Sequence, residues 1–251
     1  MTNDQALKLL LGICNLHGLK KLRHLSEHID VPHEIKTGVV KNVPCHNLVT
    51  TIRGTEKPEK KILITAHHDV VNRRSQNCLD NNGSVMNLIR LMNEVKFPKC
   101  TIIMAITDHE ETSHSRLHLN GCFQLMFEHT IDQHLDLELT SSGDIPAIST
   151  YKDFDLIEDV ISIKQPCNSA MLCSRHAVAP RGSACITLLD SESLEEYEAM
   201  GFCHRWTNCH QVSDSIEKWY NPEDCDNFVE FLKDKIINYD CLMSFKHKTS
   251  I

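Results

Sequence analysis

The sequence predicts an α/β fold, a three-layer sandwich in which helices flank a mixed, mostly parallel central sheet. Two observations predict this fold. Short continuous apolar runs, which are typical of strands buried on both faces, alternate with segments of helical periodicity. Three of these strands end in polar residues, and the ligand sites of such sheets lie outside the carboxyl ends of the strands. We expect a single domain over residues 1–251, with the N-terminal helices 1–30 packed on it.

The expected elements follow one another along the chain. Apolar residues at helical spacing predict helices over 4–17, roughly 20–29 and 81–96. Alternating or continuous apolar runs predict strands over 47–54, 60–69, 100–107, 134–141 and 183–190. Further helices are expected over 119–131, 153–163, 191–200 and 221–242, and the helix over 191–200 is expected to be solvated.

Composition excludes several classes of protein. The net charge is −8 and the chain has no basic block, which argues against binding to nucleic acid or to anionic membrane surfaces. No apolar run approaches the roughly 20 residues of a membrane span, and the N-terminal segment is typical of an amphipathic helix rather than a signal peptide. The twelve cysteines include no pair at CxxC spacing, which favours reduced thiols in a cytoplasmic protein.

The stretch after the run CTIIMAIT holds three acids within four residues, Asp108, Glu110 and Glu111. Such acids repel one another, and at the end of a buried strand they are costly unless something positive binds there. The neighbouring strands also end in potential metal ligands, since HHD follows ILITA and ELTSSGD follows HLDL. The sequence therefore predicts metal ions at the carboxyl edge of the sheet.

Two of the polar patterns have simpler explanations when each is taken alone. His67 and Asp69 share one face of an extended chain, and a carboxylate beside a histidine is typical of a metal ligand held by a second residue. A surface turn is the alternative. Asp80 precedes a predicted helix, where an ordinary N-cap is the alternative.

The remaining patterns also keep alternatives. Glu110 and Glu111 face opposite ways, which suits one metal ligand and one general base, or an exposed acidic loop. Asp136 and Glu138 share the polar face of their strand, and either could reach a metal. His210 precedes a capped helix start, where it could be incidental.

In this order the segments ILITAHHDVV, CLDNNGSV, TDHEET and HQVSDSIEK resemble the motifs of the co-catalytic zinc aminopeptidase family. That family includes bacterial leucyl aminopeptidases and is related to glutaminyl cyclases. The resemblance covers roughly residues 45–245, and the order of the motifs is specific whereas each motif alone is not. It implies a fold of the zinc aminopeptidase, or phosphorylase/hydrolase-like, kind.

The resemblance implies a set of five metal ligands. Asp80 would bridge two ions, His67 and Glu138 would complete one site, and Glu111 and His210 would complete the other. Two divalent ions carry four positive charges, which three carboxylates and a bridging hydroxide would balance. The expected cofactor is Zn²⁺, two per chain, with Mn²⁺ or Co²⁺ as alternatives.

The resemblance also implies an activity, that of a zinc metallopeptidase. Glu110 would be the general base, and Asp69 beside His67 is the other expected catalytic residue. We expect a metal-dependent hydrolase that cleaves a peptide or amide bond, an aminopeptidase whose dinuclear zinc site holds a bridging water activated by Glu110. The partner would be a peptide or small amide. The alternatives are a one-zinc acyltransferase like glutaminyl cyclase, or a non-catalytic descendant that binds peptides.

Several features depart from the family pattern. The family usually has Asp where Glu138 stands, which keeps Asp136 as the alternative ligand. The glycines that normally follow the double Glu are missing from 111–121, which bears on substrate specificity and on whether the enzyme is active. His67 and Asp80 are too close in sequence for an inserted domain between them.

Substrate contacts are expected from two further segments. Residues 166–186 could line the pocket, with His176 and Arg181 as candidates for contacting substrate, although surface positions are the alternative. The segment HRW, 204–206, is either a pocket wall or core packing.

Overall fold

Eight strands form one sheet in the computed structural model, which describes residues 1–40, 43–111, 121–150, 154–157, 159–163, 182–201 and 203–239. Across this sheet the strand order is β1-β2-β4-β3-β5-β8-β6-β7. The strands are β1 (His33–Val40), β2 (Val43–Ile52), β3 (Lys57–His67), β4 (Cys100–Thr107), β5 (Gln133–Leu137), β6 (Ile145–Thr150), β7 (Ile161–Ser162) and β8 (Ser183–Leu189).

The helices of the described residues flank this sheet. They are α1 (Asn3–Ile13), α2 (Gly18–Ser26), α3 (Gly83–Glu94), α4 (Gly121–Glu128), α6 (Ser191–Met200), α7 (His204–Asn208), α8 (Ile216–Trp219) and α9 (Pro222–Asn238), with a π-helical turn, η1 (Cys78–Asn82), directly before α3. None of these helices has the length and apolar character needed to cross a membrane.

The centre of the sheet is parallel and its margins are partly antiparallel. Strands β4, β3, β5 and β8 run parallel to one another, whereas β1, β2 and β6 each pair antiparallel with a neighbour. Every residue of β4, β5 and β8 is buried, so both faces of these central strands are covered. The predicted mixed, mostly parallel sheet flanked by helices is confirmed.

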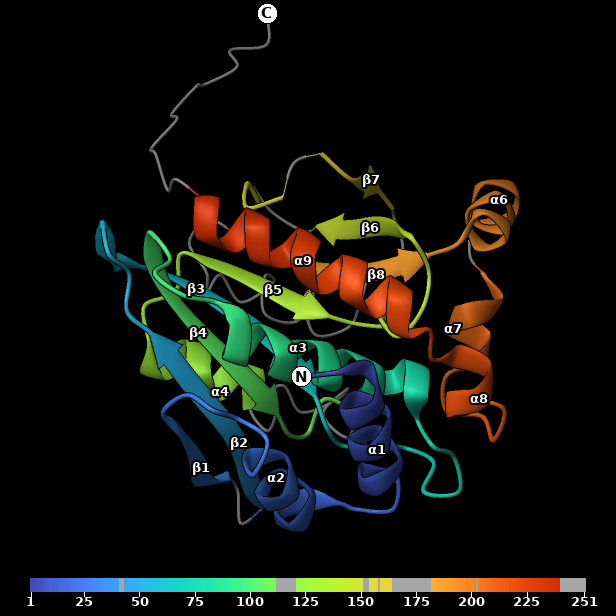
Figure 1. Cartoon of the computed structure of the whole chain (residues 1–251), viewed down its shortest axis with the longest axis horizontal. Helices are drawn as coiled ribbons and strands as arrows, with labels where there is room; N and C mark the ends of the chain where they lie inside the picture. The colour runs from blue at the N-terminus through green and yellow to red at the C-terminus, as the bar shows by residue number, and fades with distance from the viewer. Residues whose placement is uncertain are drawn as a thin grey trace, which may run out of the picture.

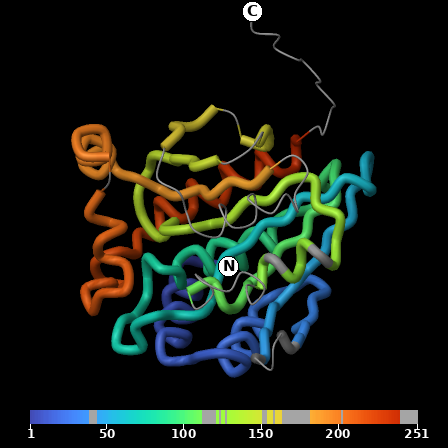
Figure 2. Tube along the Cα trace, turned by 180° about the vertical axis from the view of Figure 1, so that it is seen from behind, coloured from blue at the N-terminus to red at the C-terminus, as the bar shows by residue number. Residues whose placement is uncertain are grey.

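The described residues form a larger and a smaller apolar cluster on the sheet, and a third one, Ala147, Ile163, Leu189 and Cys203, at the β6–β8 margin. Helices α1, α2, α3 and α9 cover one face and form the larger cluster with one side of the central strands. Helix α4 covers part of the other face and forms the smaller cluster with β2, β3 and β4. Figures 1 and 2 show α3 and α9 side by side on one face and α4 on the opposite face. These layers leave the carboxyl ends of the parallel strands at one edge.

Local capping explains where several helices begin. Thr2 and Gln5 form a capping box at α1, because the Thr2 hydroxyl accepts from the Gln5 N–H and the Gln5 side chain accepts from the Thr2 N–H. Asn221 caps α9, and Pro222 follows at the first helical position, where its missing N–H costs nothing. Helix α6 is largely exposed, as its sequence predicts.

One predicted helix is wrong, the helix over 153–163. The described parts of this stretch, 154–157 and 159–163, are extended or bent, and Ile161–Ser162 forms β7 beside β6. The side chain of Gln133 accepts hydrogen bonds from the backbone N–H groups of Asp155 and Leu156, which ties this stretch to the start of β5. Branched residues such as Val160 and Ile161 also favour extended backbone.

Candidate metal centre

Three of the five predicted ligands lie at or just after the ends of neighbouring strands, and a fourth lies in the turn before α3. His67 ends β3, Glu138 follows β5, and Glu111 follows β4 after a short turn. Because β4, β3 and β5 are adjacent and parallel, their carboxyl ends place these side chains together. Asp80 lies in η1, and the fifth residue, His210, comes from the turn between α7 and α8.

Asp80 lies between the two histidines and contacts each with a different oxygen. Its Oδ1 is 2.9 Å from His67 Nε2, and its Oδ2 is 2.9 Å from His210 Nε2. Glu138 Oε1 lies 3.5 Å from His67 Nε2, and Glu111 Oε1 lies 2.8 Å from His210 Nε2. The five side chains thus form two groups, each with one histidine and one glutamate, which share Asp80.

The donor set suits divalent metal ions. In a tetrahedral zinc site, bonds of about 2.0–2.1 Å place the ligand atoms about 3.3 Å from one another. The separations between the histidine and carboxylate atoms here are close to that value, and single donor atoms of His67, Asp80 and Glu111 all lie within 4.8 Å of one another. Imidazole nitrogens with carboxylate oxygens are a common zinc ligand set. The residues could therefore hold one ion in each group.

Without a metal, the histidines and Asp80 strongly perturb one another. Burial would lower the pKa of His67, but Glu138, Asp69 and Asp80 together raise that pKa well above its usual value. Hydrogen bonds to Asp80 and Glu111 raise the pKa of His210 to about 10. Burial would raise the pKa of Asp80, yet hydrogen bonds from His210 and His67 hold it below its ordinary range. The carboxylate cluster thus attracts positive charge.

Glu110 is a buried acid beside this cluster. Its pKa is raised to about 8, first by burial, and the charges of Glu111 and Asp80 add to the increase, whereas His67 opposes it. A carboxyl with a pKa near neutrality can both accept and return a proton.

Asp69 supports the two glutamates and contacts His67. Its carboxylate accepts hydrogen bonds from the backbone N–H groups of Glu110 (3.1 Å) and Glu111 (3.0 Å). The same carboxylate lies 3.4 Å from His67 Nδ1, on the side of the ring that faces away from Asp80. Asp69 therefore fixes both the backbone of the double glutamate and the histidine ring.

The strand register separates the two acids that the sequence leaves as alternatives. Asp136 lies opposite Thr65 in the parallel β3–β5 pair, and the Thr65 hydroxyl donates to Asp136 Oδ1 at 2.6 Å. Two residues further along both strands, Glu138 comes beside His67. Asp136 therefore lies one step deeper in the sheet, among Thr65 and His134, and Glu138 is the acid that reaches the cluster.

Asp80 is not a helix N-cap. Asn82 precedes the first residue of α3, and Asp80 has non-helical backbone angles inside η1. Gly83 opens α3 against the chain after β5, where an added Cβ would lie 2.3 Å from Ser141 Cβ. This close contact brings the turn that carries Asp80 against the end of β5.

Asp214 is a site residue that the sequence reasoning did not single out. Its buried carboxylate accepts hydrogen bonds from the backbone N–H groups of Leu79 (2.6 Å) and Asp80 (3.2 Å), and burial raises its pKa to about 6. It thereby joins the Asp80 turn to the segment that carries His210. The motif HQVSDSIEK contains this aspartate four residues after His210, so the sequence motif could have pointed to it.

Lys21 is a second residue that was missed. Its side chain is fully buried under the site, and its Nζ donates to His68 O at 2.8 Å and to Asn82 Oδ1 at 2.5 Å. The lysine of α2 therefore holds the backbone after β3 and the turn before α3 together. No local pattern marks it, since lysines on amphipathic helices are usually exposed.

The other predicted substrate contacts have different outcomes. Arg205 is buried and donates to Ser142 O (2.6 Å) and Leu139 O (3.3 Å), and Trp206 packs edge-to-face on Tyr197. The segment 204–206 is therefore mainly core packing. His176, Arg181 and most of the segment 166–186 lie outside the described residues, as does most of the stretch after Glu111.

His210 is 38% exposed, so the candidate centre is open to solvent on that side.

The fold is of the α/β class found in zinc aminopeptidases. A Zn-dependent exopeptidase from Parabacteroides distasonis has a TM-score of 0.65 and 12% identity to this chain, covering 95% of this chain and 98% of that one. The zinc aminopeptidase BSAP from Bacillus subtilis has a TM-score of 0.59 and 14% identity over 78% of this chain, which spans about half of BSAP (50%).

A glutaminyl cyclase from Porphyromonas gingivalis is also similar, with a TM-score of 0.60 and 12% identity, covering 93% of this chain and 97% of that one. No protein-family model and no curated protein matches the sequence. At these identities the likeness extends to the fold alone.

Proposed function

We propose that this protein is a metal-dependent hydrolase that cleaves a peptide or amide bond, and specifically an aminopeptidase with a dinuclear zinc site. The observation that carries the proposal is the position of Asp80, whose two oxygens each lie 2.9 Å from a different histidine. A buried carboxylate shared in this way suits a bridge between two ions. The ligands would be His67 and Glu138 on one side and Glu111 and His210 on the other.

The residues around the ligands suit hydrolysis. Zinc bound there would polarise a substrate carbonyl and acidify a water. Glu110 would take the proton of the attacking water at its carboxylate and return it to the leaving amine, because it lies buried beside the ligands and burial makes a carboxylate a stronger base. Asp69 would orient His67 and hold the backbone of Glu110.

A one-zinc acyltransferase of the glutaminyl-cyclase kind is the second candidate. The likeness in fold to the cyclase from P. gingivalis supports the acyltransferase as much as the likeness to the peptidases supports the aminopeptidase. A protein that only binds peptides is a third candidate, and the buried Glu110 beside the cluster speaks against it, since binding alone needs no proton acceptor there.

Metal content per chain, measured on protein purified without added metal, tests the proposal. We expect a value near two that collapses in Asp80→Ala and falls by about half in Glu138→Gln. Asp136→Asn is the matched control and should keep both ions, because Asp136 lies beside Thr65 rather than His67. Aminoacyl and N-terminal glutaminyl substrates would then be compared.

A value near one, with cyclisation of glutaminyl peptides, would replace the peptidase with the acyltransferase. No bound metal even after zinc is supplied would overturn the ligand assignment. A cytoplasmic location belongs to the proposal, and the free thiols of the nine cysteines in the described part of the chain support it.

A further inference from the structure

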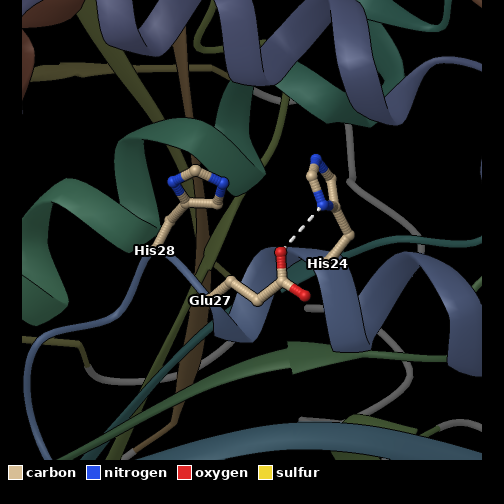
Figure 3. A group of neighbouring side chains, drawn as sticks. All are labelled: His24, Glu27 and His28. Atoms are coloured by element: carbon tan, nitrogen blue, oxygen red, sulfur yellow. Dashed lines mark hydrogen bonds and ion pairs between the residues drawn. The ribbon is translucent and has the colours of Figure 1, made fainter.

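A second group of metal-ligand side chains lies at the end of α2, apart from the centre described above. His24, Glu27 and His28 are spaced i, i+3 and i+4, which places them on one face of a helical turn. One donor atom from each residue lies within 4.8 Å of the other two. Figure 3 shows the three side chains around a common space, with His24 Nδ1 3.3 Å from Glu27 Oε2.

The backbone that carries these side chains is fixed. Asn93 of α3 donates from its side-chain amide to His28 O at 2.9 Å and accepts at its Oδ1 from the Asp30 N–H at 2.8 Å. The ring of His24 lies against α1 at Gly12, where an added Cβ would come within 3.3 Å of His24 Nε2. The turn therefore cannot move freely, which lowers the entropy lost when a ligand orders its side chains.

The side chains themselves remain accessible. The side chain of His24 is 36% exposed and that of Glu27 is 70% exposed, so an ion can reach them and water can complete its coordination. The ligand atoms need to approach from at most 4.8 Å to the roughly 3.3 Å of a tetrahedral zinc site, which small side-chain rotations achieve. The position at the carboxyl end of a nine-residue helix also favours a cation.

We propose that His24, Glu27 and His28 form a peripheral site for a divalent transition-metal ion of the Zn²⁺ and Cu²⁺ class. Two imidazole nitrogens and one carboxylate oxygen select these ions over Mg²⁺ or Ca²⁺, which prefer oxygen ligands. With three protein ligands and solvent in the remaining positions, the site binds less tightly than the buried centre. The proposal stands on residues separate from those of the proposed function.

Titration with ZnCl₂, followed by calorimetry on protein whose main site is already saturated, tests the inference. We expect the wild-type chain to bind one additional equivalent, that is one additional zinc ion per chain, and the double variant His24→Ala/His28→Ala to lose it. Glu27→Gln should weaken the same equivalent at least about tenfold, since it removes the only charged ligand. With CuCl₂, the wild-type protein should show an electron paramagnetic resonance signal with two nitrogen ligands that the double variant lacks.

Two further variants locate the additional equivalent. His204→Ala removes an exposed histidine paired with Glu196 and should leave the equivalent unchanged. Asp80→Ala should also keep it, because that residue belongs to the main centre. Absence of the equivalent from the wild-type chain, its persistence in the double variant or its loss in Asp80→Ala would each overturn the inference. Circular dichroism of the metal-free variants checks that the chain is folded.

Discussion

Lys21 shows how a single buried cation organises the candidate centre. Burial lowers its pKa to about 8, while the nearby charges of Asp69 and Asp108 oppose that decrease. The ammonium compensates part of the acidic charge beneath the site and satisfies two acceptors, His68 O and Asn82 Oδ1. Removing the ammonium would leave these two buried acceptors without the hydrogen bonds that it donates, which costs stability.

The lowered pKa of Lys21 predicts a pH-dependent stability. The unfolded lysine has a pKa of about 10.4, so between pH 8 and that value the unfolded chain binds more protons than the folded chain. The free energy of unfolding that Lys21 contributes therefore rises with pH across this window, by about 3 kcal/mol. We expect the difference in unfolding free energy, wild type minus Lys21→Met, to rise by this amount from pH 7 to 10.5 in urea titrations.

Lys20 provides the control for this prediction. It is the neighbouring residue of α2 and is exposed. The difference between wild type and Lys20→Met should stay flat over the same pH range. If the Lys21 difference is also flat, the ammonium is not buried as described.

At the scale of single residues, the sequence indicated the side chains that the structure brings together and one that holds them, Asp69, but not Lys21 or Asp214. His67, Asp80, Glu111 and His210 stand in recognisable motifs beside strand ends. Lys21 acts only because α2 docks under the end of β3, and no spacing within 18–26 reports that docking. The sequence favoured Glu138 and kept Asp136 as the alternative, and the register of β3 and β5 adds that Glu138 is the acid beside His67.

At the scale of elements, α1 gives the clearest expectation for stability. Leu10 is fully buried in the larger apolar cluster, whereas its neighbour Leu11 is 50% exposed. Leu10→Ala should lower the free energy of unfolding by about 2–5 kcal/mol. Leu11→Ala should change it by less than about 0.5 kcal/mol. Guanidinium titrations of both variants check this, and equal effects would mean that α1 does not pack as described.

Strands β2, β3, β4, β5 and β8 were predictable, whereas β1, β6 and β7 were not. Strands β4, β8 and the second half of β3 are mostly apolar and buried, and β5 alternates leucines with polar residues that are buried too. Strand β1 has largely polar and half-exposed residues, and it is a strand because β2 pairs with it over its whole length. The stretch 153–163 has helical spacing, yet Gln133 and the edge of β6 hold it extended. In both segments, contacts with residues distant in sequence determine that the backbone is extended.

At the scale of the whole molecule, the proposed metal ions would stabilise the fold, so removing them should weaken it. Asp80, Glu111 and Glu138 are all buried, and their mutual repulsion lacks full compensation once ions are removed. We expect chelation to lower the melting temperature by several degrees and stoichiometric zinc to restore it. Scanning calorimetry measures the change.

The control for chelation is Asp80→Ala, which removes the shared ligand of the main centre but keeps the group of His24, Glu27 and His28 at the end of α2. Its melting temperature should respond far less to the chelator than that of the wild-type chain. An equal response in both proteins would place the stabilising ion elsewhere.

The hydrogen bond between Asp80 and Asp214 joins residues 134 positions apart. His210 comes from the same late segment and contacts Asp80 and Glu111. During synthesis the ribosome therefore releases the early half of the cluster long before the late half exists. A nascent chain that does not yet include His210 holds Asp80 and Glu111 without that partner, since long-range contacts form only when both segments are present. The centre is thus completed only after residues 210 and 214 have been synthesised, and any ion held before that step is bound by an unfinished set of donors.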